Sequence, residues 1–390
     1  MVPIPNCKKN TQMKIGFLGD ICLLTTDLQD HNHQEVIKQF SGSGILPILQ
    51  KNDLNIGNLE CPVPGKHRGI LKSGPNMKGS AHVMDILKML GVGIVSLDNN
   101  HINDFGAGGV AATRESCTAA DILTLGPSNA LTREENTHII EGARKIGILT
   151  VAENEFNTVD AENRFDRARD PYQIVSQIIH LRRQVDFLVV ISHGGNEGFV
   201  HPNPTTRNRY RAFADLGVDV VVGHHTHCVQ GMEKYGNTLI FYSLGNFFFP
   251  FSSESESTRT GYCLMLDLPE GAQEIGYEIV PYRQCDSNYR VDPLEGEALK
   301  IFQQDFQELS AIVKDEERLH KEWMSYLKRY RNFYIKNAFP INIWPYGLLK
   351  RLGLLHLFFP KKYLVLMLDL IRNESHRGNF TQTLVRYLYK

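Results

Sequence analysis

The feature that most constrains the fold is a recurrent pairing of a short apolar run with a polar residue suited to metal binding or proton transfer. The run GFLG is followed by Asp20, NIGNL by Glu60, GIVSL by segment 98–104, FLVVIS by His193, and DVVVG by His224. Short apolar runs bounded by turn residues are typical of buried strands, and helical patterns between them predict an α/β fold. Parallel strands of such folds end at one edge, where ligands bind. We therefore expect these polar side chains to form one site.

The spacing of elements predicts a mixed sheet system. Short strands alternate with helical stretches from Lys14 to Gly126, and THIIEG and KIGILTVAE predict an antiparallel hairpin. Helices are expected over Tyr172–Val185 and Thr205–Leu216. After Gly223 the pattern changes to hairpins, with a turn near Tyr235–Asn237 and a polar stretch, SSESEST, expected to be a mobile surface loop. From Leu294 onward the chain is predicted to be helical.

Composition excludes several classes of protein. The 42 basic and 43 acidic residues give a formal net charge of −1, which is no electrostatic footprint for nucleic acid or a polybasic membrane anchor. The seven cysteines are an odd number without a CxxC pair, which argues for a reducing compartment and against a thiolate zinc site. The N-terminus has no apolar run as long as the core of a signal peptide, and 18 consecutive apolar residues, the length of a membrane span, occur nowhere. These features predict a cytoplasmic protein.

The richest apolar stretch, INIWPYGLLKRLGLLHLFFPKKYLVLMLDLI, lies near the C-terminus. It is broken by Pro345, Pro360 and basic residues. We expect helices that pack on the main domain, and leave peripheral contact with a membrane surface as the alternative.

The candidate donors are carboxylates, amide oxygens and imidazoles. This mixture suits zinc, manganese or iron better than calcium, which prefers oxygen alone, or structural zinc, which prefers sulfur. A single aspartate after a strand is more often a turn former or helix cap, and a single histidine is more often structural. The segment GHHTH differs, because three imidazoles within four positions after a buried strand repel or desolvate one another unless a cation or an acid engages them.

Other catalytic and nucleotide-binding motifs are missing from the sequence. No GxSxG elbow occurs, and Ser243 in YSLGN lacks the flanking glycine of a nucleophile turn. Cys22 and Cys228 lie next to candidate ligands, but a buried structural role is the commoner one for cysteine. Neither GxGxxG nor GxxxxGK[ST] is present, so dinucleotide and P-loop sites are not supported.

Six motifs in order resemble one known family. GDICLL resembles its GDxML segment, NLECPV its NLExP segment, and DNNHINDFG its NNHxxDxG segment; HGGNEG, GHHTHCVQ and LIFYSLGNFFF resemble HWGxE, GHHPHxxQ and IxYSLGNF. Together they cover Lys14–Phe249, and the family is CapA, associated with capsular poly-γ-glutamate synthesis. CapA is in turn similar to calcineurin-like metallophosphoesterases. The resemblance implies an α/β (α+β) fold, a four-layer sandwich of two mixed β-sheets flanked by helices, here with a helical C-terminal extension.

The resemblance also implies a role for each matching residue. The metal ligands would be Asp20, Glu60, Asn100, His193, His225 and His227. The general acid would be His101, oriented by Asp104. The residues on the substrate side would be Glu197, Asn246 and His224. The implied cofactor is one or two divalent transition-metal ions: manganese, zinc or iron.

Three departures from the metallophosphoesterase pattern bear on the metal count. Cys22 stands where the D-x-H motif has histidine, NLE replaces GD-x-x-D, and His101 is not followed directly by an acid. One ligand of the superfamily is therefore missing, which favours one ion, or a second held loosely.

We expect a CapA-type domain over residues 14–290 and a helical region over 291–390. The expected function is capsule or poly-γ-glutamate biosynthesis, as a metal-dependent hydrolase or transferase. Its partner would be an anionic polymer or a small phosphorylated or peptidic substrate, without nucleic acid. Two alternatives stay open: a non-catalytic polymer-binding or export accessory, and a phosphomonoesterase or nucleotidase.

Overall fold

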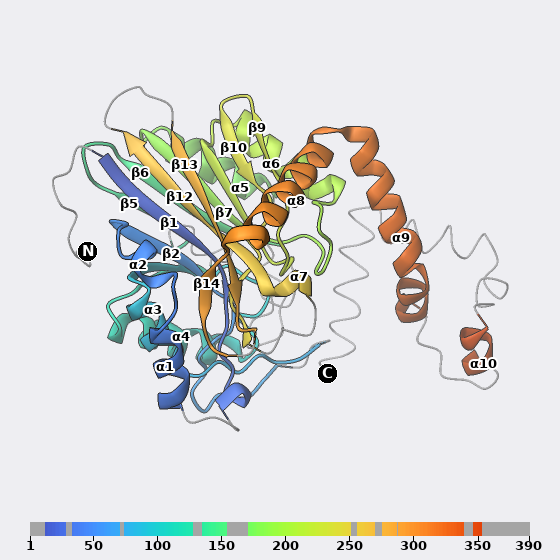
Figure 1. Ribbon diagram of the computed structural model, residues 1–390, viewed down its shortest axis with the longest axis horizontal. Helices are drawn as coiled ribbons and strands as arrows, with labels where there is room; N and C mark the ends of the chain where they lie inside the picture. Colours follow the sequence, from blue (N-terminus) through green and yellow to red (C-terminus); the bar gives the residue numbers. More distant parts are fainter. Residues whose placement is uncertain are drawn as a thin grey trace. The chain divides into compact units, whose positions relative to one another are not determined.

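A computed structural model describes residues 12–28, 33–70, 74–127, 135–153, 171–250, 256–269, 275–286, 288–338 and 346–352. The chain divides into two compact units, one of residues 1–161 and 166–319 and the other of residues 162–165 and 320–390. All of the candidate site residues belong to the first unit, whose elements are shown in Figure 1.

Within the described residues, the first sheet has eight strands in the order β14-β13-β12-β1-β2-β3-β4, with β11 also paired to β1. Its strands are β1 (Gln12–Ile21), β2 (Leu54–Leu59), β3 (Val92–Ser96), β4 (Leu123–Leu125), β11 (Asn246–Phe248), β12 (Thr260–Pro269), β13 (Gly276–Gln284) and β14 (Val291–Pro293). The strands β1 to β4 and β11 run parallel, whereas β12, β13 and β14 pair antiparallel to their neighbours. This sheet is therefore mixed.

The second sheet has the order β5-β6-β7-β8-β10-β9. Its strands are β5 (Thr137–Ile140), β6 (Ile146–Ala152), β7 (Phe187–His193), β8 (Val220–His224), β9 (Met232–Tyr235) and β10 (Thr238–Phe241). The central strands are parallel, and the outer strands β5 and β9 are antiparallel to β6 and β10. The hairpin predicted from THIIEG and KIGILTVAE and the reversal near Tyr235 are both confirmed.

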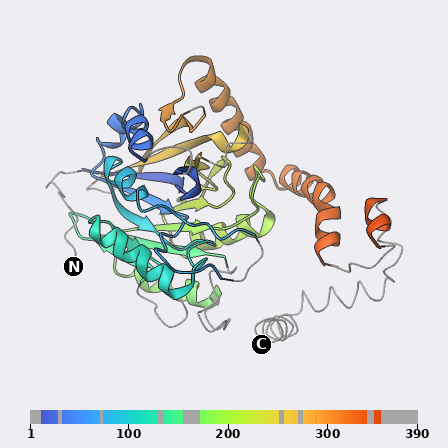
Figure 2. The same ribbon diagram turned by 90° about the horizontal axis from the view of Figure 1, so that it is seen from below.

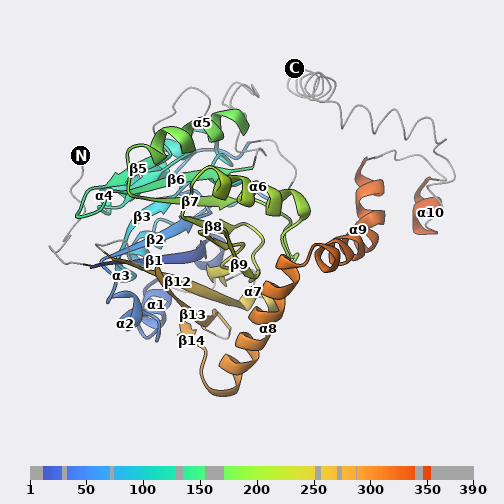
Figure 3. The same cartoon turned by 90° about the horizontal axis from the view of Figure 1, so that it is seen from above.

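Helices cover the outer faces of both sheets. On the first sheet they are α1 (His33–Ser41), α2 (Leu46–Leu49), α3 (Val83–Met89) and α4 (Gly106–Ala119), and on the second they are α5 (Pro171–Arg182) and α6 (Pro204–Asp215). The first unit also contains the 3-10 turn η1 (Thr26–Leu28), α7 (Glu256–Arg259) and α8 (Gly296–Lys314), whose Phe302 joins the apolar cluster between the sheets. Seen from below and from above, the two sheets lie stacked between helices (Figures 2 and 3).

Side-chain alternation explains the layers. In β7, Val189 and Ile191 belong to the apolar cluster between the sheets, whereas Leu188 and Val190 belong to the cluster beneath α5 and α6. Because successive strand residues point to opposite faces, a strand that is apolar at every position must be buried on both sides. A third cluster packs the other sheet against α1, α2, α3 and α4. The expected four-layer sandwich of two mixed sheets is thereby confirmed.

The first unit extends past the boundary expected at residues 290 and 291. Strand β14 pairs with β13, and α8 contacts β9, so both elements belong to this unit, which ends at Leu319. Pairing of β14 with the sheet and apolar packing of α8 through Phe302, neither of which the sequence pattern revealed, account for the difference.

The second unit contains most of α9 (Glu316–Ala338) and α10 (Tyr346–Arg351). Along α9, the rings of Trp323 and Tyr326 are stacked with centroids 5.4 Å apart. Of the apolar C-terminal stretch, only α10 and Leu352 fall within the described residues, so its expected packing lies outside them.

Two further outcomes concern membranes and the polar stretch SSESEST. Among the residues that the structure describes, none of the helices combines the length and apolarity needed to cross a bilayer. Residues 256–259 form α7 where we expected a loop, and the preceding part of SSESEST lies outside the described ranges.

Candidate metal centre

The site lies at the carboxyl ends of parallel strands from both sheets. Asp20 is at the end of β1, and Glu60 directly follows β2. His193 ends β7, and the segment 224–227 ends and follows β8. The shared strand direction brings residues more than 200 positions apart in the sequence into contact, as the sequence pattern predicted.

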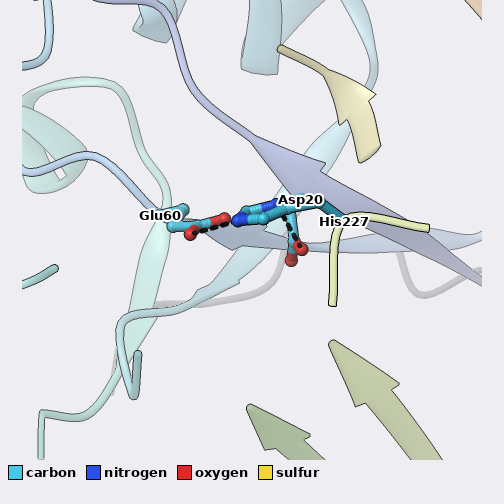
Figure 4. Close-up of side chains that lie close together, drawn as sticks. All are labelled: Asp20, Glu60 and His227. Atoms are coloured by element: carbon cyan, nitrogen blue, oxygen red, sulfur yellow. Dashed lines mark ion pairs between the residues drawn. The ribbon is translucent and has the colours of Figure 1, made fainter. Parts of the chain in front are cut away.

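Asp20, Glu60 and His227 form one donor group. Their ligand-type atoms lie within 4.8 Å of one another. His227 Nδ1 is 3.7 Å from Asp20 Oδ2, and His227 Nε2 is 3.5 Å from Glu60 Oε1 (Figure 4). Both carboxylates are 0% exposed. Two buried carboxylates beside one imidazole fit a divalent cation, because buried charges are costly unless they are paired or coordinated.

Asn100, His193 and His225 form a second donor group beside the first. His193 Nε2 is 3.0 Å from Asn100 Oδ1 and 3.1 Å from His225 Nδ1. Asn58 bridges the two groups, because its Nδ2 lies 2.8 Å from Asp20 Oδ1 and 3.3 Å from His193 Nδ1. The six predicted ligands are therefore brought together as two adjacent trios.

Asp20 is held by three donors. Its Oδ1 accepts hydrogen bonds from His224 Nδ1 at 2.9 Å and Asn58 Nδ2 at 2.8 Å, and its Oδ2 accepts one from the His225 amide at 3.2 Å. Burial disfavours the ionised carboxylate, but the His224 hydrogen bond and the nearby imidazole charges outweigh it and hold the pKa of Asp20 well below its usual range. Asp20 is therefore an ionised ligand candidate.

Burial favours the neutral form of both imidazoles in the second trio. Burial, and then repulsion from a protonated His225, lowers the pKa of His193 well below its ordinary value. Burial and repulsion from His227 lower the pKa of His225. A neutral imidazole has the lone pair that a metal ligand needs.

The backbone of the GHHTH loop is unusual. His225 has φ 93° and His227 has φ 58°, in the left-handed region that side-chain-bearing residues rarely adopt. Such strain persists where the surrounding structure over-determines it, and it is concentrated at functional sites. The loop is thus held in a conformation that places both imidazoles in the site.

The predicted acid and its orienting residue are in contact. His101 Nδ1 is 2.9 Å from Asp104 Oδ2, and Asp104 also accepts a hydrogen bond from the Met77 amide at 2.7 Å. Because a carboxylate can only accept, His101 donates from Nδ1, and Nε2 is the ring atom suited to proton transfer. The side chain of Asp104 is fully buried and that of His101 is 10% exposed.

The three residues expected on the substrate side differ in position. Glu197 is exposed, and its negative charge favours the protonated form of His225. His224 and Asn246 are instead 2% and 0% exposed, and they contact Asp20 and His227. Their burial favours support of the metal ligands over contact with a substrate.

Cys22 and Asn58 both lie next to candidate ligands, but only Asn58 contacts them. Cys22 is fully buried in an apolar cluster with Cys61, Met77 and Phe249, outside the donor group found among the described residues. Sequence reasoning missed Asn58 as an individual residue. The available signal was its place two positions before Glu60, which puts both side chains on one face of an extended strand.

The comparisons with known proteins concern the same part of the chain. Residues 14–250 match the family model described as bacterial capsule synthesis protein PGA_cap. PGA biosynthesis protein CapA of Bacillus subtilis (strain 168) is 27% identical over 247 residues, which are 61% of this chain and 63% of that protein. Capsule biosynthesis protein CapA of Bacillus anthracis is 26% identical over 257 residues, 62% of this chain and 61% of that protein. The chain thus spans slightly under two thirds of these relatives.

A further relative and one solved structure are more distant. A probable polyglutamine synthesis accessory protein of Mycobacterium tuberculosis is 27% identical over 168 residues, 39% of this chain and 44% of that protein. A putative 5'-nucleotidase from Staphylococcus aureus, solved in complex with alpha-ketoglutarate, has a TM-score of 0.45 and 15% identity over 78% of this chain and 58% of that chain. The family match covers more than half of the chain, and this protein therefore belongs to the bacterial capsule synthesis protein family PGA_cap.

Proposed function

We propose that the protein is a metal-dependent hydrolase or transferase that acts on a capsule-polymer or poly-γ-glutamate related substrate. The observation that carries the proposal is the convergence of Asp20, Glu60 and His227 from both sheets into one buried donor group. Membership of the capsule synthesis family supports the substrate class.

The residues present suit this chemistry. Asp20, Glu60 and His227 would hold one divalent transition-metal ion, and Asn100, His193 and His225 would hold a second. Bound metal would supply Lewis acidity and would lower the pKa of a coordinated water to about 7. The chain itself would supply proton transfer: His101, held through Nδ1 by Asp104, would protonate the leaving group from Nε2.

One observation each supports two other functions. The adjacent second trio supports a phosphomonoesterase or nucleotidase, which needs two metal positions. The name of the mycobacterial relative, an accessory protein of polyglutamine synthesis, supports a non-catalytic role in handling polymer. The phosphomonoesterase or nucleotidase would lose turnover when His101 is replaced. The non-catalytic accessory would have no turnover to lose.

Metal content and turnover test these alternatives together. Elemental analysis of protein purified without chelator should find about one or two transition-metal ions per chain in the wild type, as expected of such sites, and none in His225→Ala/His227→Ala. Turnover should be assayed with a phosphomonoester and with poly-γ-glutamate chains.

The His101→Asn variant should retain its metal and lose turnover by about 10²- to 10⁴-fold, the range typical of general acid catalysis. Glu115→Gln, on the outer helix α4, is the matched control. A metal-free wild type that binds no added manganese, zinc or iron would contradict the metal site. A His101→Asn variant as active as the wild type would contradict the catalytic role.

A further inference from the structure

Asn246, like His224, is buried next to the first donor group although the sequence suggested a place on the substrate side. It begins β11 and is paired with Asp20 across the parallel β1–β11 ladder. It is 0% exposed, and its main-chain oxygen accepts a hydrogen bond from the Tyr282 hydroxyl at 3.1 Å. A side chain held in this way cannot reach a substrate unless the strand moves.

The orientation of the Asn246 amide follows from two of the groups around it. Its Nδ2 lies 3.4 Å from the Thr258 carbonyl oxygen, and its Oδ1 lies 2.9 Å from His227 Nδ1. A carbonyl oxygen can only accept, so the amide nitrogen belongs on the Thr258 side and the amide oxygen faces His227. An amide oxygen can also only accept, and the proton of the neutral imidazole must therefore be on Nδ1.

This proton position determines which atom of His227 is available to a cation. With Nδ1 protonated, the lone pair of the ring is on Nε2, the atom 3.5 Å from Glu60 Oε1. The opposite tautomer would place a proton between the imidazole and Glu60. His227 also has a left-handed backbone, so its placement depends on surrounding contacts.

We propose that Asn246 is a positioning residue of the metal centre: its side-chain oxygen fixes the Nδ1–H tautomer and ring orientation of His227, so that Nε2 binds the cation. The inference rests on the proposed function, since it assumes that this centre binds metal. Hydrogen bonds of this kind from the far side of a histidine ligand orient the ring and raise its basicity.

The test compares metal affinity and tautomer in three variants. Asn246→Leu removes the acceptor at similar volume, Asn246→Asp keeps an acceptor, and Asn136→Leu removes an equally buried asparagine that contacts Thr150 and Gln177 instead. Affinity for Mn²⁺ and Zn²⁺ is measured by calorimetric titration of the full chain. Nitrogen-15 NMR of the metal-free protein reports which ring nitrogen of His227 carries the proton.

Asn246→Leu should lower metal affinity by about 10- to 100-fold, the usual effect of removing such a partner. It should also lose the Nδ1–H signature. Asn246→Asp should retain both properties, and Asn136→Leu should lower thermal stability without changing affinity. This pattern separates positioning from a general loss of stability.

Each contrary outcome is distinct. A folded Asn246→Leu variant with wild-type affinity overturns the role of Asn246 and leaves the proposed function intact. A wild type that binds neither metal overturns the proposed function and this role with it. If Asn246→Leu does not fold, the tautomer of the metal-free wild type decides, because a proton found on Nε2 overturns the inference.

Discussion

At the residue scale, the site is organised by hydrogen bonds that leave one oxygen of Asp20 for a cation. Its Oδ1 already accepts two side-chain donors, His224 and Asn58, whereas Oδ2 accepts only a longer bond from a main-chain amide among the contacts described. Oδ2 also lies 3.7 Å from His227 Nδ1, the ring nitrogen that faces Asn246. The buried polar residues around Asp20 therefore stabilise its ionised form and orient its carboxylate.

The lowered pKa of His193 predicts a pH dependence of folding. Unfolded histidine takes up a proton below about pH 6.5, whereas buried His193 stays neutral, so acidification favours the unfolded chain. Between about pH 7 and about pH 5.5 the metal-free protein should lose about 1 kcal/mol of its free energy of unfolding through this residue alone.

Urea unfolding of the wild type and His193→Gln at both pH values checks this prediction, since the variant should lose less stability. Burial raises the pKa of Asp27 to about 6, which adds a pH dependence of the opposite sign, but both proteins share it and it cancels in the difference. Equal losses in the two proteins would show that His193 is protonated as readily in the native state as in the unfolded chain.

At the scale of elements, glycines allow close backbone approach at two points, between β1 and the residue before β11 and between β8 and the residue after β10. A Cβ on Gly19 would lie 2.1 Å from the main-chain oxygen of Gly245, and one on Gly223 would lie 1.9 Å from that of Tyr242. Neither backbone oxygen can move without separating strands. These glycines directly precede Asp20 and His224, so close backbone packing and ligand placement occur at the same points of the sheets.

Gly19→Ala should therefore lower the free energy of unfolding by about 1–3 kcal/mol, the typical cost of overpacking, and should weaken metal binding by displacing Asp20. Gly142→Ala is the matched control, because its Cβ would be 3.5 Å from the nearest atom, at an ordinary contact distance. Denaturant titration measures both variants. If Gly19→Ala were as stable as the control, β1 and β11 would have to separate more easily than their geometry implies.

At the scale of the whole first unit, the donor group joins the two sheets. Asp20 and Glu60 come from the first sheet, whereas His227 follows β8 of the second. A bound ion would therefore cross-link the sheets at the edge where their parallel strands end. Metal bound only by the native state adds RT ln(1 + [L]/Kd), about 2.7 kcal/mol at a hundredfold excess over Kd.

Wild-type protein should accordingly unfold at a higher temperature with Mn²⁺ or Zn²⁺, by several degrees, and a chelator should reverse the shift. Glu60→Gln keeps the side-chain size but removes one charged ligand, so its shift should be much smaller. Thermal unfolding followed by circular dichroism measures both. A variant stabilised by metal as much as the wild type would place the bound ion elsewhere.

Much of the fold and of the donor set was predictable because both depend on local patterns. The runs FLVVI of β7 and VVV of β8 are apolar at every position, as strands buried on both faces must be, and parallel strands end at a common edge. Any polar residue that follows such strands is placed near that edge. Asp20, Glu60, His193 and His227 could therefore be grouped before their contacts were known.

The roles of Asn246 and His224, and the extent of the first unit, depended on tertiary structure. The pairing of Asn246 with Asp20 is a register between strands far apart in the sequence, which local periodicity does not encode. Burial of His224 against Asp20 likewise requires both sheets to be packed together. By itself the sequence determined which chemical groups reach the edge of the sheets; only the packed sheets decided which of them face the cation position and which hold the others in place.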